Sequence, residues 1–417
     1  MGLIPFPLTG IIPTLAQPLP ERIFVLTDQI PETKLLTPAR IGSLFYLGFF
    51  LSTGSFSPFL YVYYSELGFT GQQVGLLATF FPLMTLLFAT PLSSLADRKR
   101  WRARMAQITL LGVAVIFFFM QFPRSFAGVA WLMLPMALFF SPVMSLADSL
   151  IARMAQRRGL NYGSMRLFGS IGFATSALIF GAIWLRVGFK PMFTVGSLLL
   201  IPLIWVTGQL EEGAARDPQE RAPLTQLFRD TGLVLLLMGT FLAGIANGLS
   251  MTFEGIYVTS LGGTSFLIGL MSAFAAYSEL PTMLYGQRIG LKLRGANAVI
   301  LAFGLSTCAY LGFVLLPNPN IMPIFSVLKG LGFGLFFTNT VRLITERAPA
   351  EWASTAQSLM TVGMFGLAPL IAGPLGGWIH DAISPSAVFA LGALALVVAA
   401  LVLGLGEMRG KFVETIT

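Results

Sequence analysis

Five ionisable residues lie deep inside long apolar runs of the sequence. They are Asp148, Arg166, Glu254, Glu279 and Lys329. A charge held in hydrocarbon is costly unless it is paired or hydrated, so such residues are rare and commonly functional. Acids and bases in this setting can bind a polar solute or carry a proton. Each of the five is therefore a candidate functional residue.

Asp148 and Arg166 flank a hairpin that we expect near residues 157–158. Helices joined there run antiparallel, which places both side chains about 12–15 Å from that end at 1.5 Å of rise per residue. The predicted Asp–Arg pair has two interpretations. It is a structural salt bridge between two helices, or it opens to bind a substrate, with the guanidinium donating and the carboxylate accepting. We favour the binding site.

The second half of the chain holds two deep acids, Glu254 and Glu279, and one deep cation, Lys329. Lys329 can neutralise one carboxylate, and burial of the other without a partner favours its protonated form. Such a group can couple transport to protons. Glu279 is favoured because nearby Pro281 removes a backbone donor and can kink its helix. Glu254 is the second candidate, and static pairing with Lys329 or Arg342 is the alternative for both.

The elements that position these residues are apolar runs of about 20 residues, long enough to cross a bilayer. Of the 417 residues, 55% are hydrophobic and 11% are charged, and the mean hydropathy is +0.79. Soluble proteins carry about 25% charged residues. The sequence predicts an all-α membrane protein of 12 transmembrane helices in two six-helix, pseudo-symmetric bundles. The expected spans are 41–66, 72–94, 104–121, 127–152, 165–186, 190–208, 231–259, 265–288, 296–316, 320–345, 353–378 and 386–406.

Four segments follow from this pattern. Residues 1–40 contain seven prolines and lack a signal-peptide pattern, which predicts a cytoplasmic N-terminal extension. Residues 41–208 form the first bundle and residues 231–417 form the second bundle with a short tail. The polar stretch 209–230 between them is a cytoplasmic linker.

Basic residues gather in the even-numbered loops and in the tail, as in the run Arg98-Lys99-Arg100. This bias predicts a multi-pass protein of the plasma (inner) membrane with both termini in the cytoplasm. The net charge of +8 is scattered over short loops, so it does not indicate a nucleic-acid partner.

Metal and cofactor chemistry is not indicated. The chain has one histidine, His380, and one cysteine, Cys308, which cannot supply a usual set of zinc ligands. His380 and its neighbour Asp381 fall in a predicted outer loop. No cluster of catalytic residues suggests a membrane-embedded enzyme. We expect the partners to be a small-molecule substrate, protons and the lipid bilayer, and the protein to be a monomer.

Several motifs resemble the major facilitator superfamily over residues 41–410. Asp97 and Arg98, in the run Leu95–Arg100, are similar to its loop motif after the second span, although Ser93 stands where a glycine is usual. The run YGSMRLFGSIGF (162–173) resembles the fifth span of lactose permease, where an Arg binds sugar with an acid on the previous helix. The resemblance implies these roles for Arg166 and Asp148.

The same resemblance limits the substrate and the coupling site. Phe173 replaces the Trp that stacks on galactose, so galactoside specificity is not implied. Ser278–Pro281 resembles the eighth-span acid of the nucleoside and phenylpropionate symporters, which implies coupling by Glu279. In the tenth span Ser326, Lys329 and Gly332 replace the permease's Lys, His and Glu, so its usual proton site is absent.

The resulting hypothesis is proton-coupled symport of a small organic solute by alternating access. Arg166 and Lys329 could meet a carboxylate, which favours aromatic or other organic acids. Asn247 and Asn339 offer hydrogen bonds, which keeps sugars and nucleosides open. The alternative is an uncoupled facilitator or a drug-type exporter of the same fold.

Overall fold

The computed structural model describes residues 37–211, 224–349 and 352–412, without the side chains of Asp97 and residues 224–226. The described residues from Pro38 onward form one compact unit. Its first helix begins at Pro38, so the expected boundary at residue 40 falls inside that helix. Residues 1–36 of the predicted extension and residues 212–223 of the predicted linker lie outside the described residues.

The apolar spans predicted from the sequence are helices. In the described part of the chain, 11 helical segments are long and apolar enough to cross a membrane, and the shorter Met192–Gly208 stands where the sixth span is expected. The prediction of an all-α fold with 12 spans is therefore confirmed. The 11 segments are Pro38–Glu66, Gly71–Ala96, Arg102–Phe119, Phe126–Arg158, Tyr162–Val187, Thr231–Ser260, Ser265–Leu293, Asn297–Leu315, Met322–Arg347, Ala353–Ala382 and Pro385–Met408.

Some spans are built from more than one helical element. The first half contains α1 (Pro38–Phe56), α2 (Leu60–Glu66), α3 (Gly71–Ala78), α4 (Phe80–Met84), the π-helix η1 (Thr85–Ala89), α5 (Thr90–Lys99), α6 (Arg102–Phe119), α7 (Phe126–Phe140), α8 (Val143–Arg158), α9 (Tyr162–Val187) and α10 (Met192–Gly208). The second half contains the short η2 (Leu224–Arg229), α11 (Thr231–Ser260), α12 (Ser265–Leu293), α13 (Asn297–Leu315), α14 (Met322–Arg347), α15 (Ala353–Thr361), the π-helix η3 (Val362–Leu367), α16 (Ala368–Ala382) and α17 (Pro385–Met408).

The hairpin beside the first charged pair is sharper than the sequence suggests. Helix α8 continues to Arg158, beyond the expected end at residue 152, and Gly159 then turns the chain with φ of 63°. A glycine in this left-handed region is a common helix terminator. Asn161 starts α9 by accepting a hydrogen bond from the Ser164 N–H at 3.2 Å. Arg157 and Arg158 lie in the last turn of α8, where cations are favourable. The helix therefore continues through them, and the predicted loop is reduced to residues 159–161.

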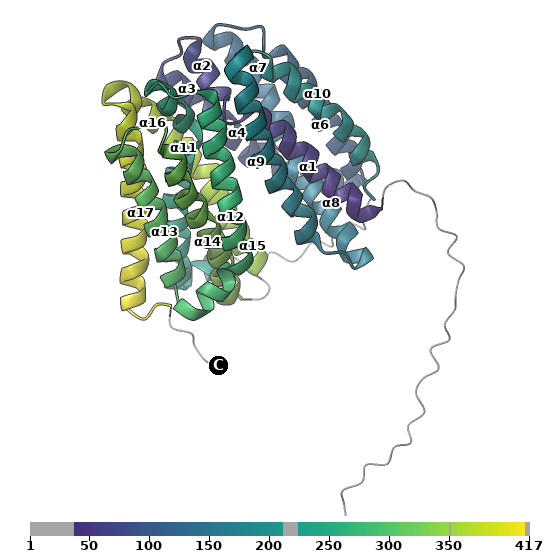
Figure 1. The fold of residues 1–417 in the computed structure, drawn as a ribbon. Coiled ribbons are helices and arrows are strands. Elements are labelled where there is room, and N and C mark those ends of the chain that lie inside the picture. Colours follow the sequence, from purple (N-terminus) through teal and green to yellow (C-terminus); the bar gives the residue numbers. More distant parts are fainter. Residues whose placement is uncertain (1–36, 212–223, 350–351, 413–417) are drawn as a thin grey trace, which may run out of the picture. The chain divides into compact units, whose positions relative to one another are not determined.

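Each half packs mainly within itself. In the first half α1 packs on α9 and α10, and α6 packs on α10. In the second half α11 packs on α16 and α17, α12 on α14, and α13 on α14 and α17. The main contacts between the halves are α9 with α12 and α3 with α16. Figure 1 shows α9 and α12 side by side where the two halves meet.

Glycines allow α3 and α16 to pack with their backbones close together. A Cβ atom on Gly75 would lie 2.1 Å from the Gly373 carbonyl oxygen, and one on Gly377 would lie 2.3 Å from the Gly71 carbonyl oxygen. No other residue type fits at such separations, and small residues are typical of close helix contacts in membranes. This contact joins the two halves at the start of α3.

A carboxylate strengthens the same contact. Asp381 accepts hydrogen bonds from the backbone N–H groups of Gly71 at 2.7 Å and Gln72 at 2.9 Å. An acid is favourable there because the first N–H groups of a helix lack partners within the helix. The expectation of an outer loop at His380 and Asp381 is therefore wrong: both lie in α16, and Asp381 binds the first turn of α3 across the two halves.

Candidate functional site

The first polar network joins α1, α8 and α9. The Arg166 guanidinium (Nη1) donates to the Tyr162 hydroxyl at 2.9 Å and to Asp148 Oδ2 at 3.4 Å. The Tyr46 hydroxyl donates to Asp148 Oδ1 and lies 3.1 Å from the Tyr162 hydroxyl oxygen. Asp148 and Arg166 are thus brought together, as expected, and two tyrosines complete the network.

The exposure of this network decides what it can do. The side chains of Arg166 and Asp148 are 53% and 29% exposed. An exposed ion pair contributes only about 0–1 kcal/mol. A ligand carboxylate or hydroxyl could replace one partner at little cost, because guanidinium and carboxylate groups form strong hydrogen bonds with such groups. The two phenol hydroxyls add groups that can both donate and accept.

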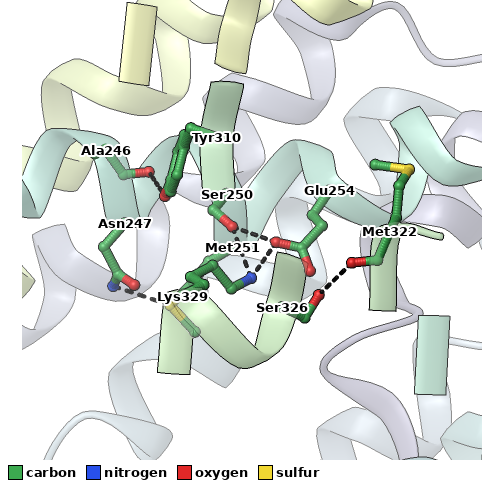
Figure 2. A network of polar contacts seen from close by, with 9 residues as sticks. All are labelled: Ala246, Asn247, Ser250, Met251, Glu254, Tyr310, Met322, Ser326 and Lys329. Carbon is green, nitrogen blue, oxygen red and sulfur yellow. Dashed lines mark hydrogen bonds and ion pairs between the residues drawn. The ribbon is translucent and has the colours of Figure 1, made fainter. Parts of the chain in front are cut away.

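The second polar network lies between α11 and α14, and Figure 2 shows it with Lys329 directed at Ser250 and Glu254. Lys329 Nζ donates to Glu254 Oε2, and to the Ser250 hydroxyl oxygen at 3.1 Å. Ser250 in turn donates to Glu254 Oε2. The side chains of Lys329 and Glu254 are only 21% and 13% exposed. This pair is more enclosed than the first, so its two charges depend more strongly on each other.

Other residues of α11 surround this pair. Asn247 lies on the same face of the helix, since residues spaced by three and seven positions share a side, and its amide nitrogen is 3.5 Å from the Met251 sulfur (Figure 2). The Tyr310 hydroxyl of α13 donates to the Ala246 carbonyl at 2.7 Å. Asn247 therefore stands beside the charged pair, while Tyr310 holds α13 against α11.

Glu279 is placed differently from Glu254. It lies in α12, partly buried, and within the described part of the chain its carboxyl group forms no hydrogen bond or ion pair. Glycines of α14 allow α12 to approach it closely. A Cβ atom on Gly330 would lie 2.1 Å from the Ala275 carbonyl oxygen, and one on Gly334 would lie 2.8 Å from the Glu279 carbonyl oxygen. In the described part of the chain, Lys329 thus forms its ion pair with Glu254 and not with Glu279.

The contact between α9 and α12 connects the two halves near these groups. The hydroxyls of Thr175 and Tyr277 are 2.8 Å apart across it. Phe173 packs against a small cluster of alanines from both helices, namely Ala174, Ala273 and Ala276. Phe173 thus lies two turns from Arg166 on α9 and contacts the helix that carries Glu279.

Three predicted site residues remain, namely Asn339, Arg98 and Asp97. Asn339 is fully buried, and its amide donates to the Gly286 carbonyl at 3.0 Å and the Leu335 carbonyl at 2.9 Å. It contacts the neighbouring helix rather than open space in this conformation. Arg98 lies exposed in the last turn of α5. The Asp97 side chain lies outside the described part of the structure.

Four residues of the two networks were not predicted from the sequence: Tyr46, Tyr162, Ser250 and Tyr310. Tyr162 and Ser250 each precede a predicted site residue by four positions, so the same helical face could have indicated them. Tyr46 is 102 residues from Asp148 and Tyr310 is 64 residues from Ala246, and no local pattern connects such positions. Among the described residues, no group of three or more His, Cys, Asp or Glu side chains is arranged to hold a metal ion.

Comparison with known proteins gives relatives over most of the chain. The model of the MFS_1 like family matches residues 41–391. The maltose permease of Geobacillus stearothermophilus is 26% identical over 371 residues, which cover 88% of this chain and 94% of the permease. The "Probable 3-phenylpropionic acid transporter" of Escherichia coli is 26% identical over 318 residues, covering 72% of this chain and 80% of that protein.

Solved structures show the same fold. A crystal structure of the nucleoside transporter NupG, in a mutant form, matches with a TM-score of 0.79 at 15% identity, covering 90% of this chain and all of that chain. At this identity the likeness concerns the fold alone.

Proposed function

The chain belongs to the MFS_1 like family and is a multi-pass membrane transporter, and from this premise we propose that it couples the movement of a small organic solute to protons. Two halves with separate polar networks suit alternating access, in which a central site faces each side of the membrane in turn. The solute binds first at the network of Tyr46, Asp148, Tyr162 and Arg166.

One observation carries the proton coupling. Lys329 forms its ion pair with Glu254, and among the described residues the Glu279 carboxyl group forms neither an ion pair nor a hydrogen bond. A partly buried carboxyl group without a partner is stable when it is protonated and unstable when it is charged, unless water reaches it. Glu279 can therefore take up a proton where its surroundings are hydrated and keep it while they are closed. Glu254 is the second candidate for the same role, after separation from Lys329.

The substrate class follows from the first network. Its exposed guanidinium can bind a carboxylate, while its phenols and its own carboxylate can bind hydroxyl groups. The relatives named for maltose and for 3-phenylpropionic acid fit these two chemistries. We infer that the solute is an organic acid or a hydroxylated compound such as a sugar or nucleoside. Phe173 of the first half is the proposed apolar contact of the solute, and Asn247 of the second half is its proposed polar contact.

The proposed location is the inner membrane of a bacterium, with both termini in the cytoplasm. The basic residues of the even-numbered loops support this orientation. In the structure, Arg157 and Arg158 bind Glu211, with Arg158 Nη2 2.5 Å from Glu211 Oε1. The basic end of the first half is therefore also the end where the chain leaves toward the proposed linker.

The test has two stages. Purified protein is first screened by thermal shift against sugars, nucleosides and aromatic acids, because a ligand of the folded state raises the melting temperature. The ligand is then added outside proteoliposomes that contain a pH-sensitive dye. Coupled symport predicts acidification of the interior as solute enters down its gradient. Solute entry without a change of internal pH would instead identify an uncoupled facilitator or an exporter of the same fold.

A further inference from the structure

A basic hollow lies at the end of the first half, and its lining residues belong to neither polar network. Its volume is about 450 Å³, and it is formed where the turn between α5 and α6 meets the end of α10. Among the described side chains, three cations and one tryptophan line it and no acid does: Lys99, Arg100, Arg104 and Trp101. Gln107, Gly208 and Leu210 complete most of the remaining wall. Such a hollow is chemically suited to an anion.

The turn holds its cations in place. Arg100 has φ of 54°, in the left-handed region that non-glycine residues seldom adopt. The chain reverses there, and the Lys99 ammonium lies 4.9 Å from the centre of the Trp101 ring. A cation over an indole ring is attracted by its π-electrons. Lys99, Trp101 and Arg104 are therefore presented on one short segment.

The hollow continues into a surface that faces lipid. Arg104 lies on the same side of α6 as Ile108, Leu111 and Val115, at spacings of four, seven and eleven residues. All three apolar side chains are exposed. On α10, which packs against α6, Trp205 is also exposed. Cations at the helix end followed by a lipid-facing apolar stripe match the order of headgroup and acyl chain in a phospholipid.

The corresponding corner of the second half is built differently. There the turn between α12 and α13 also carries an arginine in the left-handed region, Arg294, with φ of 55°. Glu407 from the end of α17 fills that corner and accepts a hydrogen bond from the Ala296 N–H at 3.0 Å. Of the described residues at the end of α10, Gly208 and Leu210 line the hollow. In the described part of the structure, the second half thus places a carboxylate in its corner, whereas the lining of the first half's hollow is cationic.

We propose that this hollow binds the headgroup phosphate of an anionic phospholipid, with the acyl chains along the exposed face of α6. Basic pockets between transmembrane helices at the cytoplasmic side are suited to such headgroups. The site is separate from the solute pathway, so it does not depend on proton coupling or on the identity of the solute.

The first test measures lipid binding to the purified full-length protein by native mass spectrometry, with phosphatidylglycerol and phosphatidylcholine as probes. The pocket variant is Lys99→Gln/Arg100→Gln/Arg104→Gln. The matched control, Arg288→Gln/Lys292→Gln/Arg409→Gln, removes three other exposed cations. We expect the pocket variant to lose at least about tenfold in affinity for phosphatidylglycerol, since each cation near the headgroups attracts anionic lipid. The control should bind like the wild type.

Several results would overturn the proposal. Equal losses in both variants would mean general surface charge, and equal binding of the two lipids by the wild type would mean no selectivity for the anion. If millimolar inorganic phosphate bound by itself and displaced phosphatidylglycerol, a soluble anion would be the occupant instead of a lipid.

A second measurement does not require the triple variant to fold. Brominated lipids quench nearby tryptophans, and the difference between wild type and Trp101→Phe isolates the signal of Trp101. At equal mole fraction in nanodiscs, brominated phosphatidylglycerol should quench that signal more strongly than brominated phosphatidylcholine. Equal quenching by the two lipids would contradict an anionic-lipid site.

Discussion

At the residue scale, the two deep ion pairs differ in how firmly they are held. Arg166 and Asp148 share their network with two tyrosines and are 53% and 29% exposed, whereas Lys329 and Glu254 are largely enclosed with Ser250. An enclosed charge that loses its partner has neither water nor a counter-ion to stabilise it. The second pair should therefore behave as a unit, while the first remains available to a ligand.

This difference gives a prediction for Lys329 and Glu254. Lys329→Ala alone should destabilise the protein by roughly 3 kcal/mol, because Glu254 is left enclosed without a counter-charge. The double variant Lys329→Ala/Glu254→Ala should be less destabilised than that single variant. Thermal unfolding of the purified proteins measures both effects, and the double-mutant cycle gives the coupling energy. Additive losses would mean that the two side chains do not depend on each other.

At the residue scale the sequence also predicted most, but not all, of the candidate site. Asp148 and Arg166 could be paired because a short turn fixes their relative depth. Which acid binds Lys329 could not be predicted, since Glu254 and Glu279 lie on different helices and the choice depends on how α11 and α12 pack on α14. Tyr46 joins Asp148 only through tertiary packing, so no pattern near either residue indicates it.

At the element scale, hydropathy located the spans but not their contacts. The apolar runs predicted the helices because a bilayer requires continuous apolar segments of fixed length. The end of α8 was missed because Arg157 and Arg158, which look like loop residues, occupy its last turn. The pairing of α3 with α16 depends on glycines that are far apart in the sequence, and sequence spacing alone does not reveal such a meeting.

The α3–α16 contact leads to a prediction about opening at that end. Gly373→Leu should force the helices apart, because even a Cβ atom at Gly373 would lie 2.4 Å from the Gly75 carbonyl oxygen. Cysteines introduced near the start of α3 should then react faster with a membrane-impermeant maleimide. Gly404→Leu in α17 is the matched control, since nothing lies within 4 Å of its Cβ position. Equal labelling of both variants and the wild type would show that this contact does not close that end of the protein.

At the scale of the whole molecule, the two halves contribute different parts of the proposed mechanism. The first half holds the exposed network that is suited to binding a solute. The second half holds the Lys329–Glu254 pair and a deep acid, Glu279, that forms no ion pair or hydrogen bond among the described residues. Packing of α9 on α12 connects them, with Thr175 and Tyr277 hydrogen-bonded across the contact. Solute binding in one half can thus be sensed in the other through a direct helix contact.

The central claim is that Glu279 carries the coupled proton. It is tested most directly by comparing Glu279→Gln with the wild type in proteoliposomes, using the solute identified by thermal shift. The amide mimics the protonated acid and cannot release a proton, so the variant should exchange solute across the membrane at equal pH. It should fail to accumulate solute when an inward proton gradient is imposed. Accumulation by Glu279→Gln at the wild-type level under that gradient would contradict the account.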